Sequence, residues 1–138
     1  METLADRVGE VARCRGLVAD YLRAIDSGRA TAAIDAFAED ADFEAHGQVF
    51  RGHAEIRGFL TRREADSARQ TAHVLANEVV TRHDDGGIEL RALLLLHVRQ
   101  PDGSYRLDRV LDTVHQFRNG GGGWRIARRT ATPLHPTA

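Results

Sequence analysis

The chain has 138 residues, with 19 basic and 20 acidic side chains and a formal net charge of −1 at pH 7. This length suits a single domain spanning residues 1–138, and the balanced charge argues against a nucleic acid or a membrane as partner. Every basic residue other than histidine is an arginine, which excludes a Schiff-base lysine and a phosphate-binding P-loop.

The sequence contains one cysteine, Cys14, and therefore forms no internal disulfide. Its first 16 residues are charged throughout and lack the apolar run of a signal peptide. These two features predict a cytoplasmic protein.

Apolar residues recur every three or four positions from Leu4 to Ile25 and predict a first amphipathic helix of about 20 residues. Asp26 follows directly on this apolar stripe, just before Ser27-Gly28 ends the helix. A carboxylate there is costly unless it is hydrogen-bonded or functional, which makes Asp26 a candidate site residue. Tyr21, on the same stripe, either offers its phenol to a cavity or belongs to the core.

A short second helix is predicted over residues 30–38, and its apolar side includes Phe37. Residues 43–50 suggest a small hairpin centred on Gly47, with His46 near the rim of any pocket. A third helix is expected from Gly52 onward, with Phe59 on its inner stripe. Phe37 and Phe59 are therefore candidates for the apolar wall of a binding site.

Four long β-rich runs follow residue 70, and short turn sequences separate them. Strands joined by such short turns pair as an antiparallel meander. Because the helices come first and the strands later, the fold class is α+β, with N-terminal helices packed on a curved antiparallel sheet. The runs cover residues 71–83, 88–99, 105–118 and 124–132.

The apolar run from Leu93 to Leu96 includes both parities of its strand, so both faces of the sheet are expected to be covered. Helices cover one face, and a second copy of the chain is expected on the other, giving a homodimer. The residues assigned to this outer face are Leu94, Leu96, Leu111, Thr113 and Phe117.

Strand alternation places His73 on one face with Thr71, Leu75 and Asn77. Histidine is the natural proton shuttle near neutral pH, so His73 is a candidate catalytic residue and Asp26 a suitable partner. The alternative is a core histidine bonded to a backbone carbonyl. Leu75 and Asn77 would then line the substrate site.

Asp112 shares one face of its strand with Val110, Val114 and Gln116, and that face is otherwise mostly apolar. It is either a polar pocket residue or one half of an ion pair with an arginine such as Arg91 or Arg109. His97 has the parity of Leu93 and Leu95, so it either lines the cavity mouth or, being close to the turn, is exposed.

Several segments together resemble the SnoaL-like and scytalone dehydratase-like branch of the nuclear transport factor 2-like superfamily. They are YLRAIDSG, FAEDADF, the turn at Gly52 with its helix, TAHVLAN and GGWRIARR, in that order along nearly the whole chain. The resemblance implies a conical α+β barrel with a deep pocket between the helices and the sheet. This fold serves many activities, so it does not choose among them.

In scytalone dehydratase-like relatives the histidine of the matching T-x-H motif faces the cavity and partners the aspartate at the helix end. The resemblance therefore implies a pair of His73 and Asp26, with Asp112 at the position of a further polar pocket residue. The chain departs from those relatives at Ile25, where they carry a tyrosine, and has no tyrosine in residues 43–46.

The favoured function is an enzyme without cofactor or metal that acts on a small, largely apolar, oxygenated compound. Its reaction would be a dehydration, an isomerisation or a polyketide-type cyclisation that begins with proton removal beside a carbonyl. The alternative is a non-catalytic ligand-binding or assembly domain of the same fold. No metal-binding histidine spacing and no dinucleotide-binding glycine motif occur in the sequence.

Overall fold

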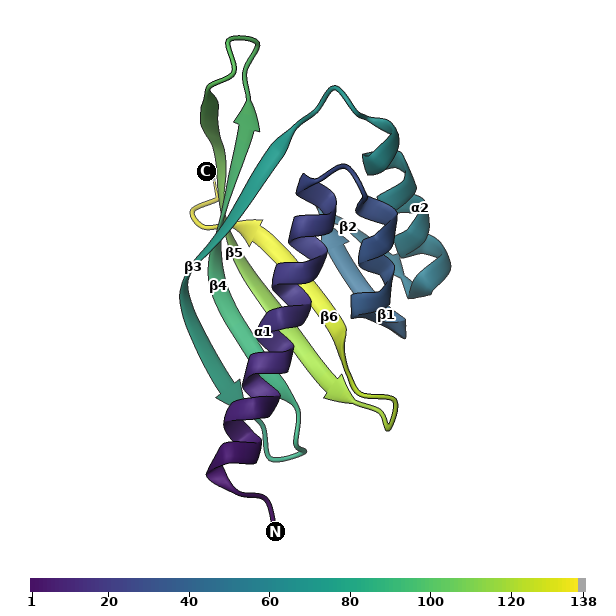
Figure 1. Ribbon diagram of the computed structural model, residues 1–138, viewed down its shortest axis with the longest axis vertical. Helices are drawn as coiled ribbons and strands as arrows, with labels where there is room; N and C mark the ends of the chain where they lie inside the picture. Colours follow the sequence, from purple (N-terminus) through teal and green to yellow (C-terminus); the bar gives the residue numbers. More distant parts are fainter. Residues whose placement is uncertain (137–138) are drawn as a thin grey trace.

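The first helix, α1 (Leu4–Asp26), crosses the sheet diagonally in the computed structural model, which describes residues 1–136 (Figure 1). Thr3 caps its start, because the Thr3 hydroxyl accepts from the backbone of Asp6 while the Asp6 carboxylate accepts from the backbone of Thr3. Ser27 caps the end of the helix, and Gly28 takes a positive φ of 80°. Asp26 is therefore its last residue, as predicted.

The 3-10 helix η1 (Ala30–Ala36) follows where a short helix was predicted. Strands β1 (Phe37–Ala45) and β2 (Gln48–Arg51) form the predicted hairpin, which turns at His46 and Gly47 with φ of 54° and 75°. Gly52, with φ of 78°, starts the second α-helix, α2 (Gly52–Ala65). Its buried residues Ile56 and Leu60 face the core.

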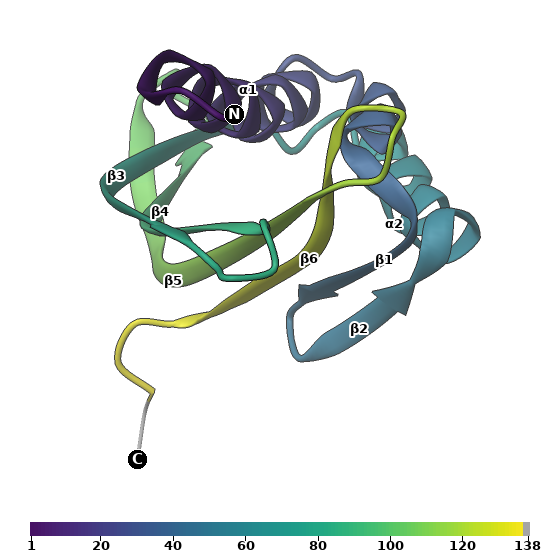
Figure 2. The same cartoon turned by 90° about the horizontal axis from the view of Figure 1, so that it is seen from below.

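Four long strands complete the sheet: β3 (Thr71–Arg82), β4 (Ile88–Arg99), β5 (Tyr105–Asn119) and β6 (Trp124–Pro133). The strand order is β2-β1-β6-β5-β4-β3. The predicted α+β class, with helices on a curved sheet, is confirmed (Figure 2). In detail the sheet is open rather than a closed barrel, and it is mixed because β1 runs parallel to β6.

The register of β4 and β5 settles which side chains face the helices. Leu94 pairs with Leu111 and Ala92 with Thr113, and this set points inward. The assignment of five residues to the outer face was therefore wrong, because four of them are buried and Leu111 packs partly buried against the core. Alternation defines two sets of residues but does not say which set faces inward when both are apolar. The five are Leu94, Leu96, Leu111, Thr113 and Phe117.

The outer face of the sheet carries the opposite set, in which Leu95 pairs with Val110 on one side and Val74 on the other. Val74 is 46% exposed, and Leu93, Leu95 and Val110 are partly exposed. A homodimer through this face stays a prediction, now with these residues at its centre.

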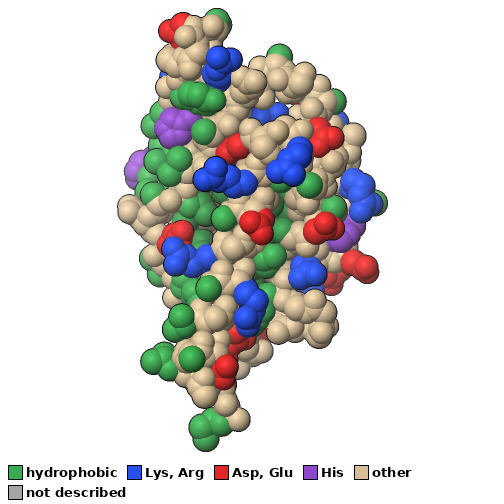
Figure 3. Space-filling view, in the orientation of Figure 1, with side chains coloured by type: hydrophobic (Ala, Val, Ile, Leu, Met, Phe, Trp, Pro, Cys, Tyr) green, Lys and Arg blue, Asp and Glu red, His purple; other side chains and the backbone are tan. Residues whose placement is uncertain are grey.

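Figure 3 shows the opposite, helical side of the molecule, where arginine and acidic side chains are interspersed without a patch of one sign. Within residues 1–136, no helix is both long and apolar enough to span a membrane.

Candidate active site

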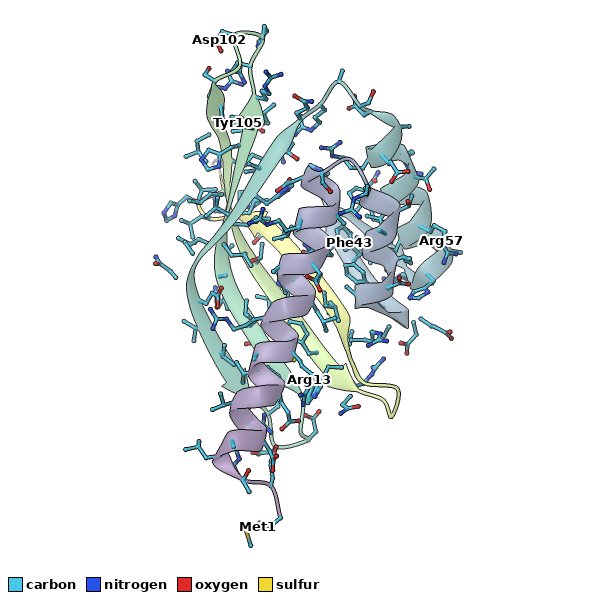
Figure 4. The ribbon with its side chains drawn as sticks, viewed as in Figure 1. Met1, Arg13, Phe43, Arg57, Asp102 and Tyr105 are labelled. Atoms are coloured by element: carbon cyan, nitrogen blue, oxygen red, sulfur yellow. The ribbon has the colours of Figure 1, made fainter. Side chains whose placement is uncertain are left out.

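A cavity of about 390 Å³ lies between the helices and the inner face of the sheet. Its volume falls in the range of pockets that hold small organic molecules. Phe43, on β1 and labelled in Figure 4, forms part of the wall. The apolar lining also includes Leu22, Ile25, Phe59, Leu94, Leu96 and Leu111, and the polar lining is Tyr21, His46, Arg63, Arg69, Thr71, His73, Arg109 and Arg129.

Asp26 and His73 are in contact at one side of this cavity. Nδ1 of His73 lies 2.6 Å from Oδ1 of Asp26, and the backbone N–H of His73 donates to Oδ2 at 2.8 Å. The hydroxyl of Thr71 donates to Oδ1 at 2.8 Å, and Arg63 in turn donates to that hydroxyl at 3.1 Å. The end of α1 and the start of β3 thus hold both side chains, and the predicted contact is confirmed.

These hydrogen bonds determine the charge of Asp26. Burial alone would raise its pKa, but the hydrogen bonds from the side chain and backbone of His73 and from Thr71 outweigh burial and hold the pKa below its ordinary value. An ionised Asp26 accepts, so Nδ1 of His73 carries the proton it donates. Nε2 of His73 has no hydrogen-bond partner within residues 1–136, and the residue lines the cavity.

A second polar pair lies deeper, where the hydroxyl oxygen of Tyr21 is 2.7 Å from Nε2 of His115. Both side chains are buried, and burial, reinforced by the charge of Arg129, lowers the pKa of His115 to about 3. His115 is therefore neutral near pH 7. Burial raises the pKa of Tyr21, so its phenol keeps its proton.

Four arginines line the cavity, and the sequence reasoning missed all of them. Arg129, on β6, is 7% exposed and donates from Nη1 to the carbonyl oxygen of Glu44 at 2.7 Å. Its guanidinium also lies over the ring of Phe43, 4.5 Å from the centroid. The other three are Arg63, Arg69 and Arg109.

Tyr21 and Phe59 line the main cavity, as predicted, and His46 reaches it as well. Phe37 does not, because it packs edge-on behind Tyr21 in the core, with ring centroids 5.2 Å apart. Leu75 lines a neighbouring cavity of about 370 Å³ between α1 and β3, together with Asp26. His73 lines both cavities and so lies on the boundary between them.

Three further predicted site residues lie outside both cavities. Asp112 points to the outer face and accepts two hydrogen bonds from Arg91, at 3.1 and 2.6 Å, so its ion-pair alternative holds. His97 pairs with Ala72, a neighbour of the inward His73, and therefore has outward parity. Asn77 is exposed with φ of 54° at the irregularity in β3, which interrupts the alternation that placed it inward.

His115 could have been recognised from the sequence only after the inner face of β5 was known. It is four residues from Leu111 and thus has the same parity. Arg129 had no such signal, since β6 contains three arginines within five residues and only the fold buries one of them.

The model of the SnoaL-like domain matches residues 6–130. The chain belongs to the SnoaL-like domain family. Among solved structures, this SnoaL-like domain is similar to an NTF2-like protein with a cystatin-like fold from Novosphingobium aromaticivorans. The two share 26% identity and a TM-score of 0.83 over 100% of this chain and 94% of that chain.

Two further structures share the fold of this SnoaL-like domain at lower identity. ActVI-ORFA from Streptomyces coelicolor is 17% identical with a TM-score of 0.81, over 93% of this chain and 99% of that one. A protein from Catenulispora acidiphila in complex with S-DNPA is 19% identical with a TM-score of 0.75, over 92% of each chain. No curated protein matches the chain.

Proposed function

We propose that this SnoaL-like domain is a small-molecule enzyme of the dehydratase, isomerase or cyclase type that works by general acid–base catalysis. One observation carries the proposal: an imidazole that lines a largely apolar cavity is held at Nδ1 by an ionised carboxylate, and its Nε2 has no hydrogen-bond partner within residues 1–136. A histidine and aspartate in this arrangement typically contribute about 10²- to 10⁴-fold to the rate.

In the proposed reaction, Nε2 of His73 removes a proton from a carbon beside a carbonyl group. The electron pair of that C–H bond moves toward the carbonyl oxygen, which becomes an enolate. Asp26 keeps the Nδ1 proton and stabilises the imidazolium that forms. For dehydration, the imidazolium returns its proton to a hydroxyl on the β-carbon, which leaves as water while the double bond forms. For isomerisation, the proton returns to a different carbon.

Tyr21 is the proposed donor to the enolate oxygen. If His115 carries its proton on Nε2, it donates to the phenol oxygen, and the Tyr21 hydroxyl is free to donate into the cavity. The other tautomer would leave a protonated Nδ1 buried without an acceptor, because Nδ1 has no partner within residues 1–136. Orphaned buried N–H groups are rare, which favours the first arrangement.

The family and the fold support a ligand in this cavity. The similar protein from Catenulispora acidiphila is in complex with S-DNPA.

Proton abstraction can be tested before the natural substrate is known. The protein is incubated in D₂O with a panel of bicyclic and tricyclic β-hydroxy ketones, and deuterium uptake beside the carbonyl is followed by proton NMR. The wild-type protein should accelerate uptake for at least one ketone, and His73→Ala should lower that rate by about 10²- to 10⁴-fold. His97→Ala is the matched control, because this histidine has outward parity.

Equal rates for wild type and His73→Ala would refute the proposed role of His73. A ketone that binds, as shown by saturation-transfer NMR, without any acceleration of uptake would favour the alternative of a ligand-binding domain.

A further inference from the structure

The charges around the main cavity are all of one sign. Arginine contributes four of its lining residues, and no aspartate or glutamate lines it within residues 1–136. Asp26 does not line the cavity, and its carboxylate accepts hydrogen bonds from His73 and Thr71. The whole chain is nearly neutral, so the segregation belongs to this cavity rather than to the composition.

Arg129 is the most deeply placed of the four. It is more than nine-tenths buried, lines the cavity, and has no carboxylate partner within residues 1–136. Its Nε is buried without any hydrogen-bond acceptor in the same range. Elsewhere in the chain, even exposed arginines find carboxylates, as Arg91 does with Asp112 and Arg118 with Asp40.

A buried charge without a counter-charge is costly. The buried guanidinium of Arg129 therefore favours a negatively charged partner from outside the chain. Its neighbours Tyr21 and His115 are neutral near pH 7 and cannot supply a negative charge. The ring of Phe43 below it offers a weak cation–π contact only.

Arg109 lines the cavity beside a histidine. Its Nη1 lies 3.3 Å from Nδ1 of His46, while its Nε lies 3.7 Å from the carboxylate of Asp108, which does not line the cavity. Burial lowers the pKa of His46, and the charges of Arg109, Arg129 and Arg69 lower it further. His46 thus stays neutral, and it supplies no negative charge to balance the arginines.

We propose that the cavity selects a ring compound that carries a carboxylate, anchored by Arg129. Arginine matches a carboxylate in shape and charge, while the apolar walls accommodate the rings. Arg69 and Arg109, both exposed, would guide the anion to the mouth. The inference rests on the proposed function for the identity of the site, and it adds the charge class of the substrate and its specificity-determining residue.

Binding measurements test the inference independently of catalysis. Isothermal titration calorimetry compares 2-naphthylacetate with its methyl ester, which has the same rings and no charge. The acid should bind at least about tenfold more tightly than the ester, since hydrogen bonds to charged groups contribute this much or more. His73→Ala should retain the preference for the acid. The binding result therefore stands even if His73 proves not to be the catalytic base.

Arg129→Gln should abolish the preference for the acid, and Arg128→Gln, at the neighbouring exposed position, should leave it unchanged. Circular dichroism establishes that each variant is folded. If Arg129→Gln does not fold, Arg109→Gln in combination with Arg69→Gln should reduce the preference instead.

Three outcomes would overturn the inference. They are equal affinity of the wild type for acid and ester, no binding of the acid at millimolar concentration, and a folded Arg129→Gln that keeps the full preference. Displacement of the acid by inorganic phosphate at a lower concentration than the acid itself requires would also overturn it, in favour of a phosphate site.

Discussion

The phenol oxygen of Tyr21 and Nε2 of His115 lie 2.7 Å apart, although 94 positions separate them in the chain. The pair joins the C-terminal part of α1 to the inner face of β5, and Tyr21 lines the cavity. Because both side chains are buried, their hydrogen bond affects stability as well as the proposed chemistry.

Tyr21→Phe should therefore lower two quantities. Loss of a donor to the developing enolate should reduce kcat by about 10²- to 10³-fold. Leaving Nε2 of His115 buried without its partner should reduce the free energy of unfolding by about 1–3 kcal/mol. Rate assays and urea unfolding measure the two effects. An unchanged kcat would show that the hydroxyl serves the fold alone.

His115 should make the protein less stable in mild acid. Its folded pKa of about 3 is far below the ordinary value near 6.5, so the unfolded state binds more protons between these values. Stability is fully present above about pH 6.5 and falls as the pH decreases, by at most about 1.4 kcal/mol per pH unit.

Urea unfolding at pH 7 and pH 5 checks this for the wild type and for His115→Gln. The variant should be less stable at pH 7 but should lose less stability between the two values. A parallel loss in both proteins would mean that other groups cause the acid sensitivity.

Asp26→Asn should impair catalysis nearly as much as the loss of His73. The amide retains the shape of the carboxylate but supplies no negative charge to the imidazolium, so kcat should fall by about 10²- to 10⁴-fold. A variant with full activity would assign the contact a structural role.

Asp112→Asn should leave activity unchanged. The side chain lies on the outer face, where its pair with the exposed Arg91 contributes little to stability because solvent screens it. The same rate assay and urea titration apply. A large loss of activity would contradict the register of β5 described above.

A homodimer through the outer face of the sheet should be detectable by light scattering at micromolar concentration. Leu95→Arg should convert it to a monomer, because this side chain is central to the apolar outer set. Val49→Arg, on the exposed strand β2 at the opposite edge, is the control and should remain dimeric. A monomeric wild type would exclude this association.

The sequence predicted the contact of Asp26 and His73 because local features determine both positions. A capping sequence ends α1 at Asp26, and His73 is the third residue of the first long strand, where alternation from Thr71 is still regular. The prediction that Asp112 lines the pocket was wrong for a non-local reason. Its strand is apolar on both faces, so only the pairing of β5 with β4 and β6 shows which face meets the helices.

The arginines were missed because their role depends on burial rather than on type. In the segment RIARR the side chains of Arg125 and Arg128 are exposed, whereas Arg129 is buried above Phe43. No pattern within the strand distinguishes them, since the irregularity between β5 and β6 shifts the alternation by one residue.

His73 lies on the boundary between two cavities, so its imidazole has a second side that the main cavity does not cover. The neighbouring cavity, lined by Arg15, Arg23 and Glu78, gives water a separate approach to this side. In the proposed reaction a proton held by the imidazole can therefore exchange with D₂O while a bulky ring compound still fills the main cavity.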